Sequence, residues 1–169
     1  ANTTAANNTA VGYNSLTANT TGTDNVAIGK NALKTSVSGN QNVAVGTDAL
    51  EVSTGSYNTG IGWNALTATT TGAGNTAVGR EALILNTTGA ANAGFGREAL
   101  RSNTTGSSNT ALGKDALFSN TTASSNTAVG TTALYANTTG ANNVAVGFQA
   151  LDANTTAEGN VAVGKGSLS

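Results

Sequence analysis

The chain has 169 residues, of which only 9% are charged and 4% aromatic, and it contains 22 glycines but no proline, cysteine, methionine or histidine. The formal net charge of −1 argues against nucleic-acid binding, and the lack of cysteine removes disulfides and thiolate metal sites. No apolar run approaches the roughly 18 residues of a membrane span, so we expect no membrane insertion. Such a restricted alphabet is typical of a repetitive sequence.

One asparagine recurs along the chain with a fixed period. Successive members are 17 residues apart, except for one gap of 16 between Asn42 and Asn58, which places a missing residue near Val52 and Ser53 in a loop. A fixed period of this length indicates a solenoid in which each repeat forms one turn. The column comprises Asn8, Asn25, Asn42, Asn58, Asn75, Asn92, Asn109, Asn126, Asn143 and Asn160.

The residues immediately after this asparagine predict a short strand followed by a corner. They alternate with period two, as in residues 9–11, and a glycine follows in every repeat, from Gly12 to Gly164. Glycine permits the positive φ of a tight corner. The last residue of the predicted strand is always apolar, as Val11, Ile28, Val45, Ile61, Val78, Phe95, Leu112, Val129, Val146 and Val163.

The rest of each unit predicts two further short sides. An alanine-leucine pair, with leucine in every repeat from Leu16 to Leu168, predicts a second strand, and an Asn-Thr-Thr segment predicts a third. Turns stacked at about 4.8 Å give an all-β parallel β-solenoid, or β-roll, of ten 17-residue rungs roughly 50 Å long. The strict valine and leucine columns, which we expect to be buried, argue against a disordered chain.

The asparagine column has two interpretations. Stacked asparagines can form an amide ladder whose side chains hydrogen-bond from rung to rung. An asparagine can also serve as a turn residue that tolerates a left-handed φ. The sequence leaves both open.

A column of small residues lies beside the apolar strand position and therefore points to the opposite face of the strand. Its strict limit to alanine or glycine predicts that another backbone approaches closely, as sister chains do in a homotrimer. The tight interior of a monomeric solenoid is the alternative. The alanines of this candidate chain-packing column are Ala10, Ala27, Ala44, Ala77, Ala111, Ala128, Ala145 and Ala162.

The segments NTAVGYNSL at residues 8–16 and NTAVGREALILNTTG at residues 75–89 resemble head repeats of trimeric autotransporter adhesins of the YadA type. They are still more similar to the 17-residue arrays of phage tail-fibre proteins that carry a C-terminal intramolecular chaperone. The resemblance covers the whole chain, although adhesin heads usually have a shorter unit with N-S-V-A-I-G. It implies a left-handed, homotrimeric β-roll that forms a rigid stalk or head and binds a surface.

Charged residues gather in the two columns after the glycine corner on three successive rungs. They form either a recognition stripe or a solvated face whose charges neutralise one another. The carboxylates lack the pattern of calcium loops, and without histidine or cysteine we expect no metal, no cofactor and no enzymatic activity. The pairs are Arg80 and Glu81, Arg97 and Glu98, and Lys114 and Asp115.

Aromatic residues are scattered over two outward columns. Tyr13, Trp63 and Phe148 share a column with the basic residues, and Phe118 and Tyr135 share another. They either stack on a sugar or a partner protein, or are the single exposed aromatics that are normal on protein surfaces.

The Asn-Thr-Thr segments offer a second function. A stacked threonine column on a low-charge rod resembles ice-binding proteins, although threonine also simply suits a strand or caps a turn. Each segment is also an N-glycosylation sequon, whose use the sequence does not decide. The candidate ladder comprises Thr20, Thr70, Thr87, Thr104, Thr121, Thr138 and Thr155.

The sequence therefore predicts a structural or adhesive segment of an extracellular, cell-surface or virion tail fibre, with ice binding as the alternative. Its expected partners are two copies of itself and a host-surface protein, a glycan or ice. Because the chain begins and ends within a repeat and shows no capping unit, we expect residues 1–169 to be one array excerpted from a longer fibre.

Overall fold

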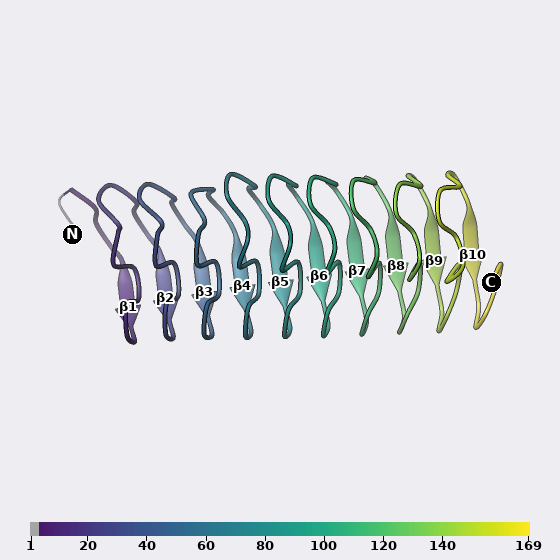
Figure 1. Cartoon of the computed structure of the whole chain (residues 1–169), viewed down its shortest axis with the longest axis horizontal. Helices are drawn as coiled ribbons and strands as arrows, with labels where there is room; N and C mark the ends of the chain where they lie inside the picture. The colour runs from purple at the N-terminus through teal and green to yellow at the C-terminus, as the bar shows by residue number, and fades with distance from the viewer. Residues whose placement is uncertain (1–3) are drawn as a thin grey trace.

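The computed structural model describes residues 4–169 as an elongated rod of stacked turns (Figure 1). Ten three-residue strands, one per turn, form a single parallel sheet in chain order. This confirms the all-β parallel β-solenoid. Within the described residues the structure has no helix, and hence none that could cross a membrane. The strands are β1 (Thr9–Val11), β2 (Val26–Ile28), β3 (Val43–Val45), β4 (Thr59–Ile61), β5 (Thr76–Val78), β6 (Ala93–Phe95), β7 (Thr110–Leu112), β8 (Thr127–Val129), β9 (Val144–Val146) and β10 (Val161–Val163).

The short repeat keeps the register of the sheet. β3 pairs with β4 through Val43 opposite Thr59, as the other neighbouring strands pair. Only Thr54 separates Ser53 from Gly55, where a regular turn has two residues at this place. The missing residue is thus absorbed in a turn outside the sheet, as the sequence predicted.

The alanine-leucine and Asn-Thr-Thr segments are turns, so the prediction of a second and a third strand is wrong. The leucines have left-handed φ values between 50° and 56°, and the residue two positions earlier, such as Glu81 or Asp115, is left-handed as well. A left-handed backbone costs a non-glycine residue roughly 1–2 kcal/mol. Burial of the leucine side chain, worth about 1.5–3 kcal/mol, offsets that cost.

The core consists of three columns of side chains inside the chain: the middle residue of each strand, and the alanine and the leucine of each alanine-leucine pair. The leucines of these pairs from Leu33 to Leu134 have no exposed surface, and neither do the alanines in the middle of the strands from Ala27 to Ala145. A Cβ added to Gly60 would lie 3.3 Å from the Leu50 Cγ atom, so the interior admits only small residues opposite leucine.

Two sequence interpretations are therefore corrected. The small column does not pack against another chain, because the chain's own leucines cover it; this applies to Ala27, Ala44, Ala77, Ala111, Ala128, Ala145 and Ala162, whereas Ala10 is exposed at the end of the rod. The valine column, which we expected to be buried, faces outward on the opposite side of each strand.

The glycine that ends each strand has a positive φ, as predicted, and is also required by the stacking. Gly113 has a φ of 144°, and a Cβ there would lie 2.5 Å from the Gly130 carbonyl oxygen of the next turn. Neighbouring turns approach too closely at this corner for any side chain.

Candidate functional site

Asparagine side chains connect successive turns inside the rod. The Asn58 Oδ1 atom accepts the backbone N–H of Asn75 at 2.9 Å, and the Asn75 amide donates to the Gly89 carbonyl oxygen at 2.9 Å. The left-handed φ belongs to the residue before each member, such as Ala91. The amide-ladder interpretation of this column is confirmed, and the left-handed interpretation is wrong.

A second ladder comes from the asparagines of the Asn-Thr-Thr segments, which sequence reasoning assigned only to a threonine-rich side. The Asn103 amide donates to Asn86 Oδ1 at 2.8 Å and to the Gly106 carbonyl oxygen at 2.9 Å. Three successive turns replace this asparagine with Ser36, Ser53 and Thr69, whose buried hydroxyls have no hydrogen-bond partner. Substitution of asparagine at three aligned positions was the sequence signal for this break.

The burial of the asparagines in the Asn-Thr-Thr segments also determines whether they can be N-glycosylated. Asn86, Asn103, Asn120 and Asn137 have no exposed surface, and the amide nitrogen of each donates to a carbonyl oxygen. A glycan on that nitrogen would break the ladder and has no room in the interior. In the folded rod, these four sequons are therefore inaccessible to glycosylation.

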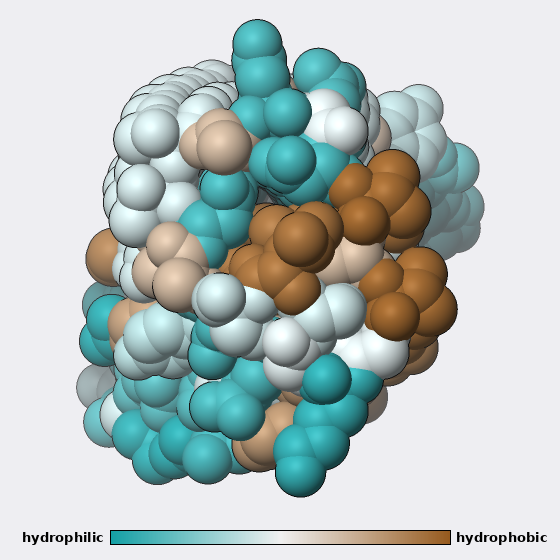
Figure 2. All heavy atoms as spheres, turned by 90° about the vertical axis from the view of Figure 1, so that its right-hand side faces the viewer, coloured by the Kyte–Doolittle hydropathy of each residue, from teal (hydrophilic) through white to brown (hydrophobic). Residues whose placement is uncertain are grey.

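Apolar side chains follow the outward face of the sheet. Among the inner turns, Ile28, Ile61, Phe95, Leu112 and Val146 are between 36% and 51% exposed although they stack on neighbours. In the view down the rod, hydrophobic side chains gather at the centre of the end and along one flank, with hydrophilic side chains above and below (Figure 2). We call the outward residues of β1 to β10 the sheet face.

The hydroxyl groups of the candidate threonine ladder form hydrogen bonds within the rod. The Thr87 hydroxyl donates to the Thr104 carbonyl oxygen at 3.0 Å and the Thr104 hydroxyl to the Thr121 carbonyl oxygen at 3.1 Å. The same bond is made by Thr20, Thr70, Thr121 and Thr138, to the carbonyl oxygens of the following turn. These hydroxyl protons already serve the stacking of turns, whereas the second threonine of each segment, such as Thr105, is exposed. Thr155 lies in the last of these segments and is exposed.

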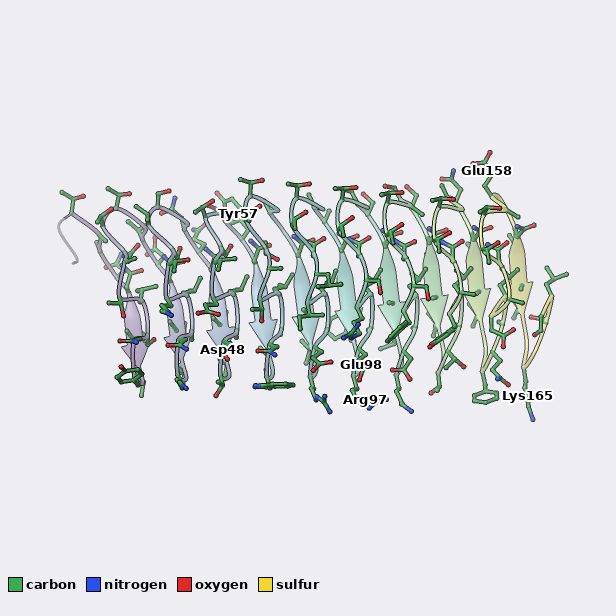
Figure 3. All side chains as sticks on the ribbon, viewed as in Figure 1. Asp48, Tyr57, Arg97, Glu98, Glu158 and Lys165 are labelled. Carbon is green, nitrogen blue, oxygen red and sulfur yellow. The ribbon has the colours of Figure 1, made fainter. Side chains whose placement is uncertain are left out.

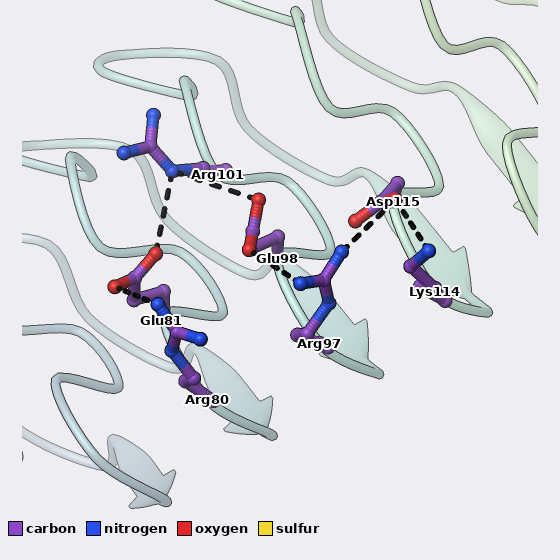
Figure 4. Close-up of polar contacts among 7 residues, drawn as sticks. All are labelled: Arg80, Glu81, Arg97, Glu98, Arg101, Lys114 and Asp115. Carbon is purple, nitrogen blue, oxygen red and sulfur yellow. Dashed lines mark hydrogen bonds and ion pairs between the residues drawn. The ribbon is translucent and has the colours of Figure 1, made fainter.

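The charged pairs predicted from the sequence lie along one edge of the rod beyond the ends of the strands, where Figure 3 shows Arg97 and Glu98. Within each turn, Arg80 pairs with Glu81 at 3.1 Å, Arg97 with Glu98 at 3.3 Å and Lys114 with Asp115 at 3.5 Å. Between turns, Arg97 reaches Asp115 at 3.6 Å (Figure 4).

Arg101, four residues after Arg97, also belongs to this cluster, although sequence reasoning left it out. Its Nε atom lies 3.6 Å from Glu81 and 3.9 Å from Glu98 (Figure 4). The four cations and three carboxylates therefore form one network over three turns.

Aromatic rings lie at both ends of this network. The Arg80 guanidinium lies over the Trp63 ring, 5.1 Å from its centroid, and Arg101 lies over Phe118 at 5.5 Å. Phe118 in turn stacks on Tyr135, with 5.1 Å between ring centroids. The rings thus support the guanidinium groups. Phe148 has Lys165 over its ring at 5.9 Å, and Tyr13 is 71% exposed.

Comparisons of the chain with protein-family models, with curated proteins and with solved structures found no match. No pocket is present in residues 4–169, and those residues contain no group of three or more acidic, histidine or cysteine side chains placed to hold a metal ion. The candidate functional regions are therefore outer surfaces. They are the sheet face, the threonine edge formed by the Asn-Thr-Thr segments, and the charged edge formed by the network from Arg80 to Asp115.

Proposed function

We propose that the chain is a segment of a homotrimeric, rigid fibre that lies outside the cell, at a cell surface or on a virion, and that serves adhesion. The observation that carries this proposal is the sheet face, where the last residue of all ten strands is apolar, with seven of these side chains exposed and three half-buried. Contiguous apolar patches of a few hundred Å² on soluble proteins are often functional surfaces.

The dimensions of the sheet face support another copy of the chain as its partner. Ten strands at about 4.8 Å span roughly 45 Å, and a width of about 10 Å gives roughly 450 Å² of surface. A partner must match both this length and the repeat of one apolar side chain per turn. A second rod of the same sequence meets both conditions, and the resemblance to trimeric fibres makes three the preferred number.

The rigidity needed by a fibre follows from the ladders. Each inner turn is joined to the next by strand pairing, by at least one buried asparagine bond and by the carbonyl bonds of the turns. Bending the rod would break several of these hydrogen bonds together. A stiff rod can therefore present the same edge residues at regular spacing along its length.

Light scattering tests the proposal on the purified chain. The chain mass is 16.4 kDa, so a trimer has a mass of about 49 kDa. The triple variant Phe95→Glu, Leu112→Glu and Val129→Glu is expected to be a folded monomer by circular dichroism. A matched variant with glutamate at Thr88, Thr105 and Thr122, which lie on the other exposed edge, is expected to stay trimeric.

Two results would overturn the proposal. A wild-type mass of one chain at micromolar concentration would remove the trimer. A monomeric rod that also shapes ice crystals would move the function to the threonine edge, where the second threonines are exposed.

A further inference from the structure

The charged edge concentrates most of the positive charge of a weakly charged chain. Of the seven lysines and arginines, four lie in the network of three successive turns, and we call these four the cationic stripe. The chain as a whole has a net charge of −1, so it does not attract anions generally. The stripe comprises Arg80, Arg97, Arg101 and Lys114.

The cations of the stripe lie outside their carboxylate partners. The side chains of Glu81, Glu98 and Asp115 are only 11%, 16% and 13% exposed. Those of Arg80, Arg97, Arg101 and Lys114 are 53%, 45%, 36% and 54% exposed. A solvated face of neutralising charges would expose both signs equally. Here the inner carboxylates hold the cations, and the surface presented to a partner is cationic.

The stripe retains donors for a ligand. An arginine has five N–H donors, and its contacts with carboxylates in the network occupy one or two nitrogen atoms of each guanidinium. The remaining donors match the oxygens of a carboxylate or sulfate. Trp63 and Phe118, which lie against two of the guanidinium groups, hold those groups in place before binding.

The arrangement of the cations indicates an extended ligand. Arg80, Arg97 and Lys114 occupy one column on successive turns and therefore repeat at about 4.8 Å along the rod. That spacing is close to the length of one sugar residue in an extended polysaccharide. A nucleic acid fits less well, because its dense phosphate charge needs more cations than the four of the stripe, on a chain whose net charge is −1.

We propose that the cationic stripe binds an acidic polysaccharide lying along the rod, with uronate carboxylates of the polymer on the column of Arg80, Arg97 and Lys114 and a further anionic group on Arg101. This inference rests on the proposed function, since it names the ligand class of the adhesive fibre. The stripe lies on the edge beyond the strands, where Arg97 is seen in Figure 3, and not on the sheet face. Assembly through the sheet face therefore does not require the stripe.

The test measures binding of the full chain to alginate by surface plasmon resonance, with neutral dextran as the negative probe. The stripe variant carries Arg80→Gln, Arg97→Gln and Lys114→Gln, and the matched control carries Lys30→Gln, Lys34→Gln and Lys165→Gln. A third variant adds Glu81→Gln, Glu98→Gln and Asp115→Asn to the stripe variant. It leaves no carboxylate of the network without its cation and restores the wild-type net charge, so it separates loss of the site from misfolding or a change in overall charge.

We expect alginate binding that weakens with added salt, no dextran binding, a loss of about tenfold or more in both stripe variants and about twofold or less in the control. Absence of alginate binding, equal loss in the control, or tighter binding to single-stranded poly(dT) than to alginate would overturn the inference. Light scattering on the same samples keeps the two proposals apart. A trimer that does not bind alginate would contradict only the proposed ligand. A monomer that binds alginate would contradict only the proposed trimer.

Discussion

Replacing Thr69 with asparagine is expected to stabilise the rod, because it restores an amide beside an intact run of the second asparagine ladder. Thr69 and Asn86 are equivalent: the backbone N–H of each donates at 3.1 Å to the leucine carbonyl three residues earlier. Both side chains are fully buried. The Thr69 hydroxyl has no partner, whereas each asparagine at this place bonds to a carbonyl oxygen of its own turn.

The magnitude follows from the bonds that the ladder makes elsewhere. By analogy with Asn103, the new amide would donate to the Gly72 carbonyl oxygen and accept from Asn86. Two hydrogen bonds at about 1 kcal/mol each, and removal of an unsatisfied hydroxyl, outweigh the entropy of ordering the side chain. We expect a net gain of about 2 kcal/mol, or roughly 4–8 °C in melting temperature for a chain of this length.

Thermal and urea unfolding followed by circular dichroism measure this gain, at one protein concentration because assembly also shifts the midpoint. Asn103→Thr makes the reverse change and is expected to lower stability by about 2–4 kcal/mol, since it leaves groups of Asn86 and Asn120 unpaired. Thr71→Asn, at the exposed second position of the same segment, should change little. An unchanged or lower midpoint for Thr69→Asn, together with the expected loss in Asn103→Thr, would refute the reasoning.

Two further predictions test the two sides of the strand and the corner. Ala128→Leu should destabilise the rod by about 1–3 kcal/mol, because it adds volume where the leucines already fill the interior. Val129→Leu, on the outer side of the same strand, should be nearly neutral. Equal effects of the two changes in urea unfolding would contradict the assignment of inner and outer faces. Gly113→Ala should cost roughly 2–4 kcal/mol by the same measurement, since its φ is 144° and the new Cβ would meet the Gly130 carbonyl oxygen; unchanged stability would show that neighbouring turns can separate there.

The period and the strand could be predicted from sequence because each depends on local or strictly repeated chemistry. A 17-residue spacing of Asn75, Asn92 and Asn109 puts equivalent residues side by side only if each repeat is one turn. Glycine after every strand marks a corner on conformational grounds alone. The register followed from these two features, and even the 16-residue repeat did not disturb it.

The inner and outer faces could not be assigned in the same way. Alternation with period two places Ala77 and Val78 on opposite sides of the strand. It does not determine which of the two sides faces the interior. Hydrophobicity favours burial of valine, and only the small space that leucines leave across the interior, as Leu83 does beside Gly94, reverses that choice. The left-handed φ of Leu83 is equally hidden, because leucine disfavours it and only the packed interior stabilises it.

The separate positions of the sheet face and the cationic stripe give the trimer a consequence for binding. A single stripe offers four cations, and each exposed ion pair contributes little by itself. If the sheet faces join three chains, one fibre segment carries three stripes on edges outside the interface. A long polysaccharide that engages a second stripe does so at a high effective concentration, which raises avidity by about 100-fold or more where the chain can span both sites. Alginate binding by the monomeric variant with glutamates at Phe95, Leu112 and Val129 should therefore be weaker than that of the trimeric variant with glutamates at Thr88, Thr105 and Thr122, which carries the same net charge. Equal binding by both would show that each stripe acts alone.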